Sequence, residues 1–211
     1  MIEIIPAILV QSETEFDDRI KTIGNLANRI QIDVLDGIFV PFKNWADPGA
    51  IQARRLSYEV EAHLMVRDPQ AVVDDWILAG ARAILPHLEA DGALAAARRA
   101  RSRGLEAGVA INPETPLDLL RDKIFDLDFV CVMGVTPGQS GQKFDESAIQ
   151  KVADLRAAYP DLRIEVDGGV NQETIAPLVR AGATALVVSS ALFKSPNFGA
   201  AYRSLQAAAN I

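Results

Sequence analysis

Eight short apolar runs alternate with amphipathic segments along the whole chain of 211 residues. Most of the runs are continuously apolar, which is typical of parallel strands covered on both faces. The strands that we expect are Ile2–Leu9, Arg29–Leu35, Glu59–Met65, Ala83–Leu88, Glu106–Ile111, Phe129–Val135, Arg163–Val166 and Ala185–Ser189. Such alternation fits two α/β arrangements, a closed (β/α)8 barrel and an open doubly wound sheet.

The regular spacing of the eight units, with short loops before the strands, favours the (β/α)8 TIM barrel with eight helices. Gly80, Gly104 and Gly182 each follow a helical segment and precede a strand, as C-terminal caps do. The hydrophobic content of 49% is enough for one sizeable core, and no Pro/Ser-rich or charge-rich stretch marks a boundary. We therefore expect a single domain over residues 1–211.

The charge balance and the N-terminus bear on partners and location. A net charge of −7 argues against a nucleic-acid backbone or an anionic membrane as partner, although local N–H groups can still bind a small phosphorylated metabolite. The N-terminal segment lacks a basic region and becomes polar too early for a signal peptide or membrane span. The lone Cys131 lies in an apolar run, so we expect a buried thiol and a cytoplasmic protein.

Polar side chains occur where several of the predicted strands end. The segment Ile164–Val170 runs from an apolar strand into Asp167, and two glycines then turn the chain toward a helix predicted to begin near Asn171. Asp33 and His63 occupy similar places in the second and third strands. Barrel enzymes build their active sites at these ends. Asp167 could instead cap the next helix, but the glycines and the matching Asp33 favour chemistry.

Other strand ends predict a phosphate site. Barrels often bind phosphate after strands seven and eight, where this chain has Gly168, Gly169, Ser189 and Ser190. The glycine-rich loop after the sixth strand, with Gly138, Gln139, Ser140 and Gly141, is suited to closing over a ligand or presenting N–H groups to it. His87 is interpreted as structural, and Asp36 as fixing the turn at Gly37.

Taken together and in order, several motifs resemble the ribulose-phosphate 3-epimerase family over nearly the whole chain. They are Ile4–Leu9, Ile32–Pro41, Ala62–Val66, Ile111–Pro116, Val132–Gly138, Gly141–Phe144, Glu165–Val170 and Ser190–Phe193. The resemblance implies a barrel enzyme that inverts C3 of a ketose phosphate, with D-ribulose 5-phosphate and D-xylulose 5-phosphate as the default pair. It also implies a homo-oligomer.

The resemblance assigns roles to individual residues. Asp33 and Asp167 match the acid/base pair, and a divalent cation (Zn, Fe, Mn or Mg) is held in the family by two histidines and two aspartates. Asp33, His63 and Asp167 match three of these ligands, while Gln31 stands where the pattern has the other histidine. Met65 and Met133, core residues by default, match methionines that cover the reacting carbons.

Other departures from the family pattern cluster at the same site. Ala7 replaces a substrate-contacting serine, and Ser189 takes a glycine position beside the phosphate. Ile38 and Phe42 stand at positions that commonly carry His and Asn, and Gln139–Ser140 replaces an apolar–glycine pair.

Two alternatives to the epimerase, and one variant of it, remain open at this point. A related decarboxylase or aldolase would carry an Asp-x-Lys signature, but Leu35 occupies the place of that lysine. A non-catalytic or altered-substrate sugar-phosphate-binding relative would explain Gln31 and Ala7 together. An epimerase that uses a weaker metal, or none, would also accommodate Gln31. We adopt the sugar-phosphate 3-epimerase as the working hypothesis.

Overall fold

The computed structural model describes residues 2–138 and 141–210. Eight parallel strands pair in chain order, and pairing of the last with the first closes the barrel. The strands are β1 (Glu3–Ile8), β2 (Arg29–Leu35), β3 (Glu59–Met65), β4 (Ala83–Pro86), β5 (Glu106–Ile111), β6 (Phe129–Met133), β7 (Arg163–Asp167) and β8 (Ala185–Val188). The barrel prediction is confirmed, and the open doubly wound sheet is excluded.

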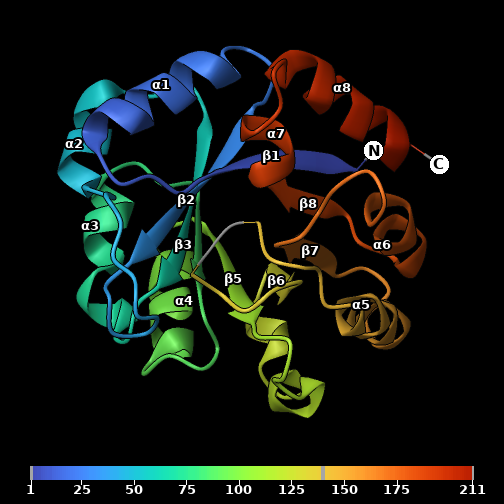
Figure 1. Ribbon diagram of the computed structural model, residues 1–211. Helices are drawn as coiled ribbons and strands as arrows, with labels where there is room; N and C mark the ends of the chain where they lie inside the picture. The colour runs from blue at the N-terminus through green and yellow to red at the C-terminus, as the bar shows by residue number, and fades with distance from the viewer. Residues whose placement is uncertain (1, 139–140, 211) are drawn as a thin grey trace.

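Helices surround the barrel on its outside, and both ends of the chain lie near α8 (Figure 1). They are α1 (Glu13–Ile23), α2 (Pro48–Arg54), α3 (Val73–Leu78), α4 (Ala93–Ser102), α5 (Ser147–Ala158), α6 (Ile175–Ala181), α7 (Ser190–Phe193) and α8 (Phe198–Ala209), with short 3₁₀ helices η1 (Pro69–Ala71), η2 (Leu117–Leu120) and η3 (Ile124–Asp126). The prediction of one helix after each strand was wrong in detail. Only the 3₁₀ helices η2 and η3 connect β5 to β6, while α7 and α8 both follow β8.

The helix predicted to begin near Asn171 begins at Ile175 instead. The Asn171 side chain accepts hydrogen bonds from the backbone N–H groups of Glu173 (2.7 Å) and Thr174 (3.2 Å). This side-chain turn satisfies backbone donors outside the helix and delays its start. The C-terminal cap predicted at Gly182 is confirmed, with φ at 112°.

Some strand ends differ from the prediction in a way that affects the mouth of the barrel. β4, β6 and β8 end earlier than expected, at Pro86, Met133 and Val188. β7 runs one residue further, so that Asp167 pairs with Met133 on one side and Val187 on the other. The carboxylate of Asp167 is therefore carried by a strand and not by a loop, which fixes its backbone.

The lower part of the barrel interior holds a network of charged side chains. Arg29 of β2 is buried and pairs with Glu59 and Glu106, both at 2.8 Å. Glu61 and Glu165 are fully buried in the same interior. Burial raises the pKa of both carboxyl groups, although neighbouring arginines oppose that shift.

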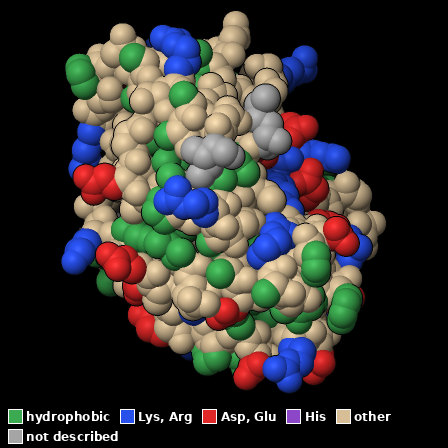
Figure 2. Space-filling view, turned by 90° about the vertical axis from the view of Figure 1, so that its right-hand side faces the viewer, with side chains coloured by type: hydrophobic (Ala, Val, Ile, Leu, Met, Phe, Trp, Pro, Cys, Tyr) green, Lys and Arg blue, Asp and Glu red, His purple; other side chains and the backbone are tan. Residues whose placement is uncertain are grey.

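The outer surface carries mixed charge. Acidic and basic side chains are interspersed on the face that includes α5, α6 and α8, and neither histidine is visible there (Figure 2). The arginines of α4 are paired, with Arg99 at 2.9 Å from Asp74 and Arg98 at 2.9 Å from Asp126. Across residues 2–138 and 141–210, the helices are too short or too polar to cross a membrane.

Close packing between β5 and β6 gives a stability prediction. Gly108 is the register partner of Phe129, and a Cβ on Gly108 would lie 2.6 Å from the Phe129 ring. We expect Gly108→Ala to destabilise the fold by about 1–3 kcal/mol, because the fully buried ring has to move. Urea unfolding measures the change.

The control is Gly199→Ala in α8, where the new methyl group meets nothing closer than 3.4 Å. Alanine favours helix over glycine, so this variant should unfold at an equal or higher urea concentration. Equal stability of the Gly108→Ala variant and the unsubstituted chain would show that the β5–β6 packing is looser than the structure indicates.

Candidate active site

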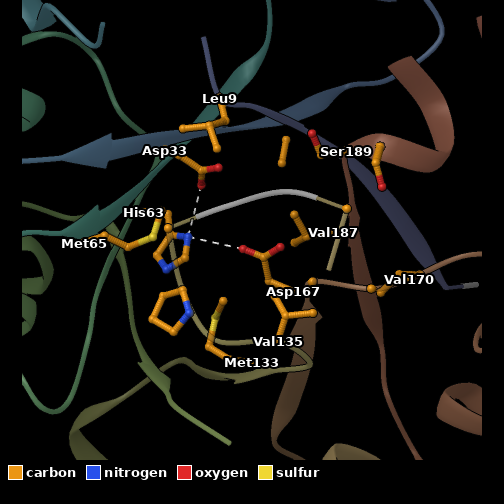
Figure 3. Close-up of a pocket in the computed structure, with 17 residues that line it drawn as sticks. Leu9, Asp33, His63, Met65, Met133, Val135, Asp167, Val170, Val187 and Ser189 are labelled. Carbon is orange, nitrogen blue, oxygen red and sulfur yellow. Dashed lines mark hydrogen bonds and ion pairs between the residues drawn. The ribbon is translucent and has the colours of Figure 1, made fainter. Parts of the chain in front are cut away.

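A pocket opens at the carboxyl ends of the barrel strands, and nearly all predicted site residues line it (Figure 3). It contains the predicted Asp33, His63, Met65, Met133, Gly138, Gly141, Asp167, Gly168, Gly169, Ser189 and Ser190, together with Ala7, Leu9, Val135, Pro137, Val170 and Val187. The predicted Gln139 and Ser140 lie outside the described residues. Gln31 is not part of the lining but lies directly beneath it, bonded to residues that are.

Three residues from distant parts of the chain converge at the base of the pocket. His63 Nδ1 lies 3.1 Å from Asp33 Oδ1 and 3.2 Å from Asp167 Oδ2 (Figure 3). Asp33 and His63 are register partners on β2 and β3, while Asp167 ends β7 across the barrel. Inward-facing positions at the same height of a closed barrel have to meet near its axis, which explains this convergence.

Gln31 connects the two carboxylates. Its Nε2 donates to Asp33 Oδ1 at 2.9 Å and to Asp167 Oδ2 at 2.8 Å, and it lies 3.2 Å from His63 Nδ1. Gln31 is fully buried, two residues before Asp33 on the same inward face of β2. Its carbonyl Oε1 has no hydrogen-bond partner among residues 2–138 and 141–210.

His87, interpreted from the sequence as structural, contacts His63 directly behind the pocket. Its ring stacks on that of His63 with centroids 5.0 Å apart, and the two Nε2 atoms lie 2.9 Å apart. His87 Nδ1 faces Glu89 Oε2 at 3.4 Å, and Glu89 Oε1 accepts from the Asn112 N–H at 2.9 Å and from the Thr115 hydroxyl. The sequence signal that could have found this chain of contacts is His-x-Glu at the end of the fourth predicted strand.

These contacts separate the protonation behaviour of the two histidines. Burial alone would lower the pKa of His63, but hydrogen bonds and charge from Asp167 and Asp33 outweigh it and raise the pKa to about 10. Burial lowers the pKa of His87, and the neighbouring charge on His63 adds to this. His87 is therefore a neutral imidazole at neutral pH, whose Nε2 can accept from His63 Nε2–H.

The pKa of Asp33 is raised above the ordinary value of an aspartate. Burial raises its pKa, and the charge of Asp167 adds to the rise, while hydrogen bonds from His63 and Gln31 oppose it. A carboxylate with a raised pKa is a stronger base, which suits proton abstraction near neutral pH.

The opposite side of the pocket is built from glycines and serines. Gly168 and Gly169 have φ values of 97° and 70°, which a residue with a side chain rarely adopts. A Cβ on Gly168 would collide with the Val135 side chain, so this position requires glycine. Without side chains at Gly168 and Gly169, the backbone is open to close approach by a ligand. The ammonium of Lys194 reaches this side too, 3.1 Å from where a Cβ on Gly141 would lie.

The donor set fits a divalent cation. Asp33, His63 and Asp167 offer ligand atoms that all lie within 4.8 Å of one another. Gln31 contacts all three residues through Nε2, and its unpartnered carbonyl oxygen would supply a fourth ligand if the amide turned over. Carboxylate and amide oxygens with one imidazole form a set that hard and borderline divalent metals accept.

The fold and the site together define a class of protein, a (β/α)8 barrel in which two carboxylates and a histidine converge at the carboxyl ends of the strands, beside two glycines of positive φ. The family model "Ribulose-phosphate 3 epimerase family" matches residues 3–193. The chain belongs to the ribulose-phosphate 3-epimerase family, whose members are isomerases.

Curated relatives agree with this assignment. The chain is 36% identical over 202 residues to ribulose-phosphate 3-epimerase of Bacillus subtilis (strain 168), covering 92% of this chain and 93% of the relative. It is 35% identical to the enzyme of the same name from Aquifex aeolicus (strain VF5), covering 88% of this chain and 86% of that one. The chloroplastic ribulose-5-phosphate-3-epimerase of Arabidopsis thaliana is 34% identical, with 96% and 75% covered.

Solved structures share the fold at lower identity. A 3-hexulose-6-phosphate synthase from Salmonella typhimurium superimposes with a TM-score of 0.78 over 98% of both chains, at 17% identity. A second 3-hexulose-6-phosphate synthase gives a TM-score of 0.73 at 20% identity, covering 98% of this chain and 99% of that one. At these identities the likeness establishes the barrel fold alone.

Because the chain has two histidines, nitrogen NMR can test their protonation without ambiguity. In chelator-treated protein at about pH 8, we expect one imidazolium spectrum for His63 and one neutral spectrum for His87, since their pKa values lie on opposite sides of that pH. Asp33→Asn removes one carboxylate partner and should lower the His63 pKa. Titration of His63 near its ordinary value would contradict the geometry.

Proposed function

We propose that this protein is a sugar-phosphate 3-epimerase that interconverts D-ribulose 5-phosphate and D-xylulose 5-phosphate. The observation that carries the proposal is the pair Asp33 and Asp167, which reach one pocket from β2 and β7. Membership of the epimerase family supports the same reaction. A cytoplasmic location and a homo-oligomer remain predictions.

The reaction needs two proton-transfer groups. The C3 hydrogen lies next to the C2 carbonyl, so its removal leaves an enediolate. We assign one of the two aspartates to remove the proton from one face and the other to return a proton to the opposite face, which inverts C3. Because epimerisation runs in both directions, the two residues exchange the roles of acid and base.

Charge on the enediolate oxygens has to be stabilised. Asp33, His63, Asp167 and Gln31 are the residues that we propose to hold a divalent cation, which when bound would supply Lewis-acid polarisation of the substrate oxygens. His63 is held in orientation by His87, whose own ring faces Glu89. Such support of a ligand histidine by a second hydrogen bond preserves its tautomer.

Apolar and backbone groups complete the site. Met65 and Met133 are both 3% exposed and line the pocket beside His63 and Asp167, where they exclude water from the reacting carbon (Figure 3). Gly168, Gly169, Ser189 and Ser190 lie across the pocket, where we place the substrate phosphate.

Replacing either aspartate tests the assignment of the acid/base pair. We expect Asp33→Asn and Asp167→Asn each to lower kcat by roughly 10²–10⁴-fold, because an amide cannot exchange the proton. The measurement is conversion of D-ribulose 5-phosphate in deuterated water, with deuterium at C3 and D-xylulose 5-phosphate both quantified.

The matched control is Asp47→Asn at the N-cap of α2. Its side chain accepts from the Ala50 N–H at 2.8 Å, and asparagine caps helices equally well. Full activity of either pocket variant would remove that residue from the proton-transfer pair. Binding of the sugar phosphate without exchange at C3 in the unsubstituted protein would favour the non-catalytic alternative.

The phosphate cradle generates a separate prediction. Gly168→Ala places a methyl group against Val135 and disturbs the backbone N–H groups of the cradle. We expect weaker binding of the sugar phosphate by roughly 10–100-fold, which corresponds to the loss of one hydrogen bond to a charged group. Calorimetric titration with D-ribulose 5-phosphate measures the affinity.

Gly80→Ala controls for backbone strain, because Gly80 also has positive φ but its Cβ would meet nothing within 4 Å. Gly80 follows α3 at the opposite end of the barrel, so its variant should lose stability and keep affinity. Equal affinities of the Gly168→Ala and Gly80→Ala variants for the sugar phosphate would show that the phosphate does not bind at Gly168.

A further inference from the structure

The amide of Gln31 is placed where a cation ligand is needed but presents the wrong atom. Both N–H groups of its Nε2 are accounted for by Asp33 Oδ1 at 2.9 Å and Asp167 Oδ2 at 2.8 Å. An NH2 group has no lone pair to offer a cation. A cation bound by the same two carboxylates would therefore meet two N–H donors, which repel it.

The other end of this amide is unsatisfied. Gln31 Oε1 is fully buried and has no hydrogen-bond partner within the described part of the chain. A buried acceptor without a donor is unfavourable, so the present orientation is maintained by the two carboxylates alone. Rotation about the terminal side-chain bond exchanges Oε1 and Nε2 without moving the backbone of β2.

The neighbouring strand offers acceptors for the rotated NH2 group. Glu61 is the register partner of Gln31 on β3, and both its carboxyl oxygens lack a hydrogen-bond partner within residues 2–138 and 141–210. Its contacts with Arg29 and Arg163 are longer, at 3.6 Å and 3.8 Å. In the rotated amide, the N–H groups point away from Asp33 and Asp167, into the interior that Glu61 shares.

We propose that the Gln31 amide is a two-position element whose rotation accompanies cation binding and sets the cation preference of the site. With NH2 toward the carboxylates it bridges Asp33 and Asp167; with the carbonyl toward them it completes a cation site. The resulting set of three oxygens and one imidazole nitrogen favours Mg²⁺ and Mn²⁺ relative to Zn²⁺, compared with a set that has two imidazoles. The inference rests on the proposed function only for the location of the site.

Cation affinities test the preference without any measurement of turnover. Chelator-treated protein is titrated with Mn²⁺ alone and Zn²⁺ alone in a calorimeter, and Gln31→His is treated in the same way. We expect Gln31→His to raise the ratio of Zn²⁺ affinity to Mn²⁺ affinity by about tenfold or more, because imidazole suits zinc better than an amide oxygen does. An unchanged ratio would overturn the proposal.

Gln172→His is the matched control, since it adds a histidine at an exposed glutamine that bonds only to Ser204 among described residues. It should leave the ratio as in the unsubstituted protein. If the unsubstituted protein binds neither cation while Gln31→His binds one, Gln31 is not a ligand, and the proposal fails.

NMR of the glutamine side-chain amides tests the rotation itself. The Gln31 resonances are identified by their loss in Gln31→His, and Mg²⁺ is added as a diamagnetic cation. We expect the NH2 protons to shift upfield as they leave the carboxylates, while the other glutamine amides keep their positions. Unshifted Gln31 resonances at a Mg²⁺ concentration that calorimetry shows to be saturating would overturn the rotation.

The cation-affinity and NMR results can be distinguished from the result of the epimerisation assay. If the protein does not epimerise the sugar phosphate but shows the expected affinity ratio and amide shift, the cation site stands and only the proposed reaction is discarded. Normal epimerisation with an unmoved Gln31 amide would do the reverse.

Discussion

Two aspartates of the same charge face one buried point at the mouth of the barrel, and the surrounding structure serves to hold them there. Asp33 and Asp167 come from strands on different sides of the barrel, yet both contact His63 Nδ1 and Gln31 Nε2. Like charges in a desolvated site repel strongly unless donors or a cation lie between them. His63 and Gln31 supply those donors, and the same arrangement of ligand atoms suits a divalent cation.

The groups behind the carboxylates explain why this arrangement is rigid. His63 stacks on His87, which faces Glu89, and Glu89 is in turn held by the backbone of Asn112 and the hydroxyl of Thr115. Beneath the site, Arg29 and its acidic partners fill the barrel with paired charge. Asp167 itself is held between β6 and β8 by strand pairing. Polar groups held in this way keep their positions without rearrangement, which is the preorganisation that the proposed proton transfer would need.

The departures from the family pattern have different structural consequences. Ala7 lines the pocket and is buried, so the change from serine removes a polar group from the wall. Ile38 and Phe42 are 64% and 41% exposed, and the Phe42 ring lies close to Gly138 of the β6–α5 loop, where a Cβ would be 3.3 Å away. Gln31 places an amide where the family pattern has an imidazole, in contact with Asp33, His63 and Asp167. These departures thus lie at three different places, the pocket wall, the β6–α5 loop and the base of the pocket, while both carboxylates are kept.

The sequence by itself determined the barrel and the family, and it placed Asp33, His63, Asp167 and the two following glycines at the ends of strands. The barrel follows from apolar strand periodicity and the family from an ordered set of motifs, and both signals lie in residues that are consecutive in the chain. Tertiary structure alone decided that Gln31 bridges both carboxylates, that His87 supports His63, and that Glu61 lies beside Gln31. It also decided that Asn171 forms a turn before the helix and that 3₁₀ helices connect β5 to β6. Each of these depends on which side chains meet across the barrel or compete for a backbone donor, and distances between strands far apart in the chain are set only when the barrel closes.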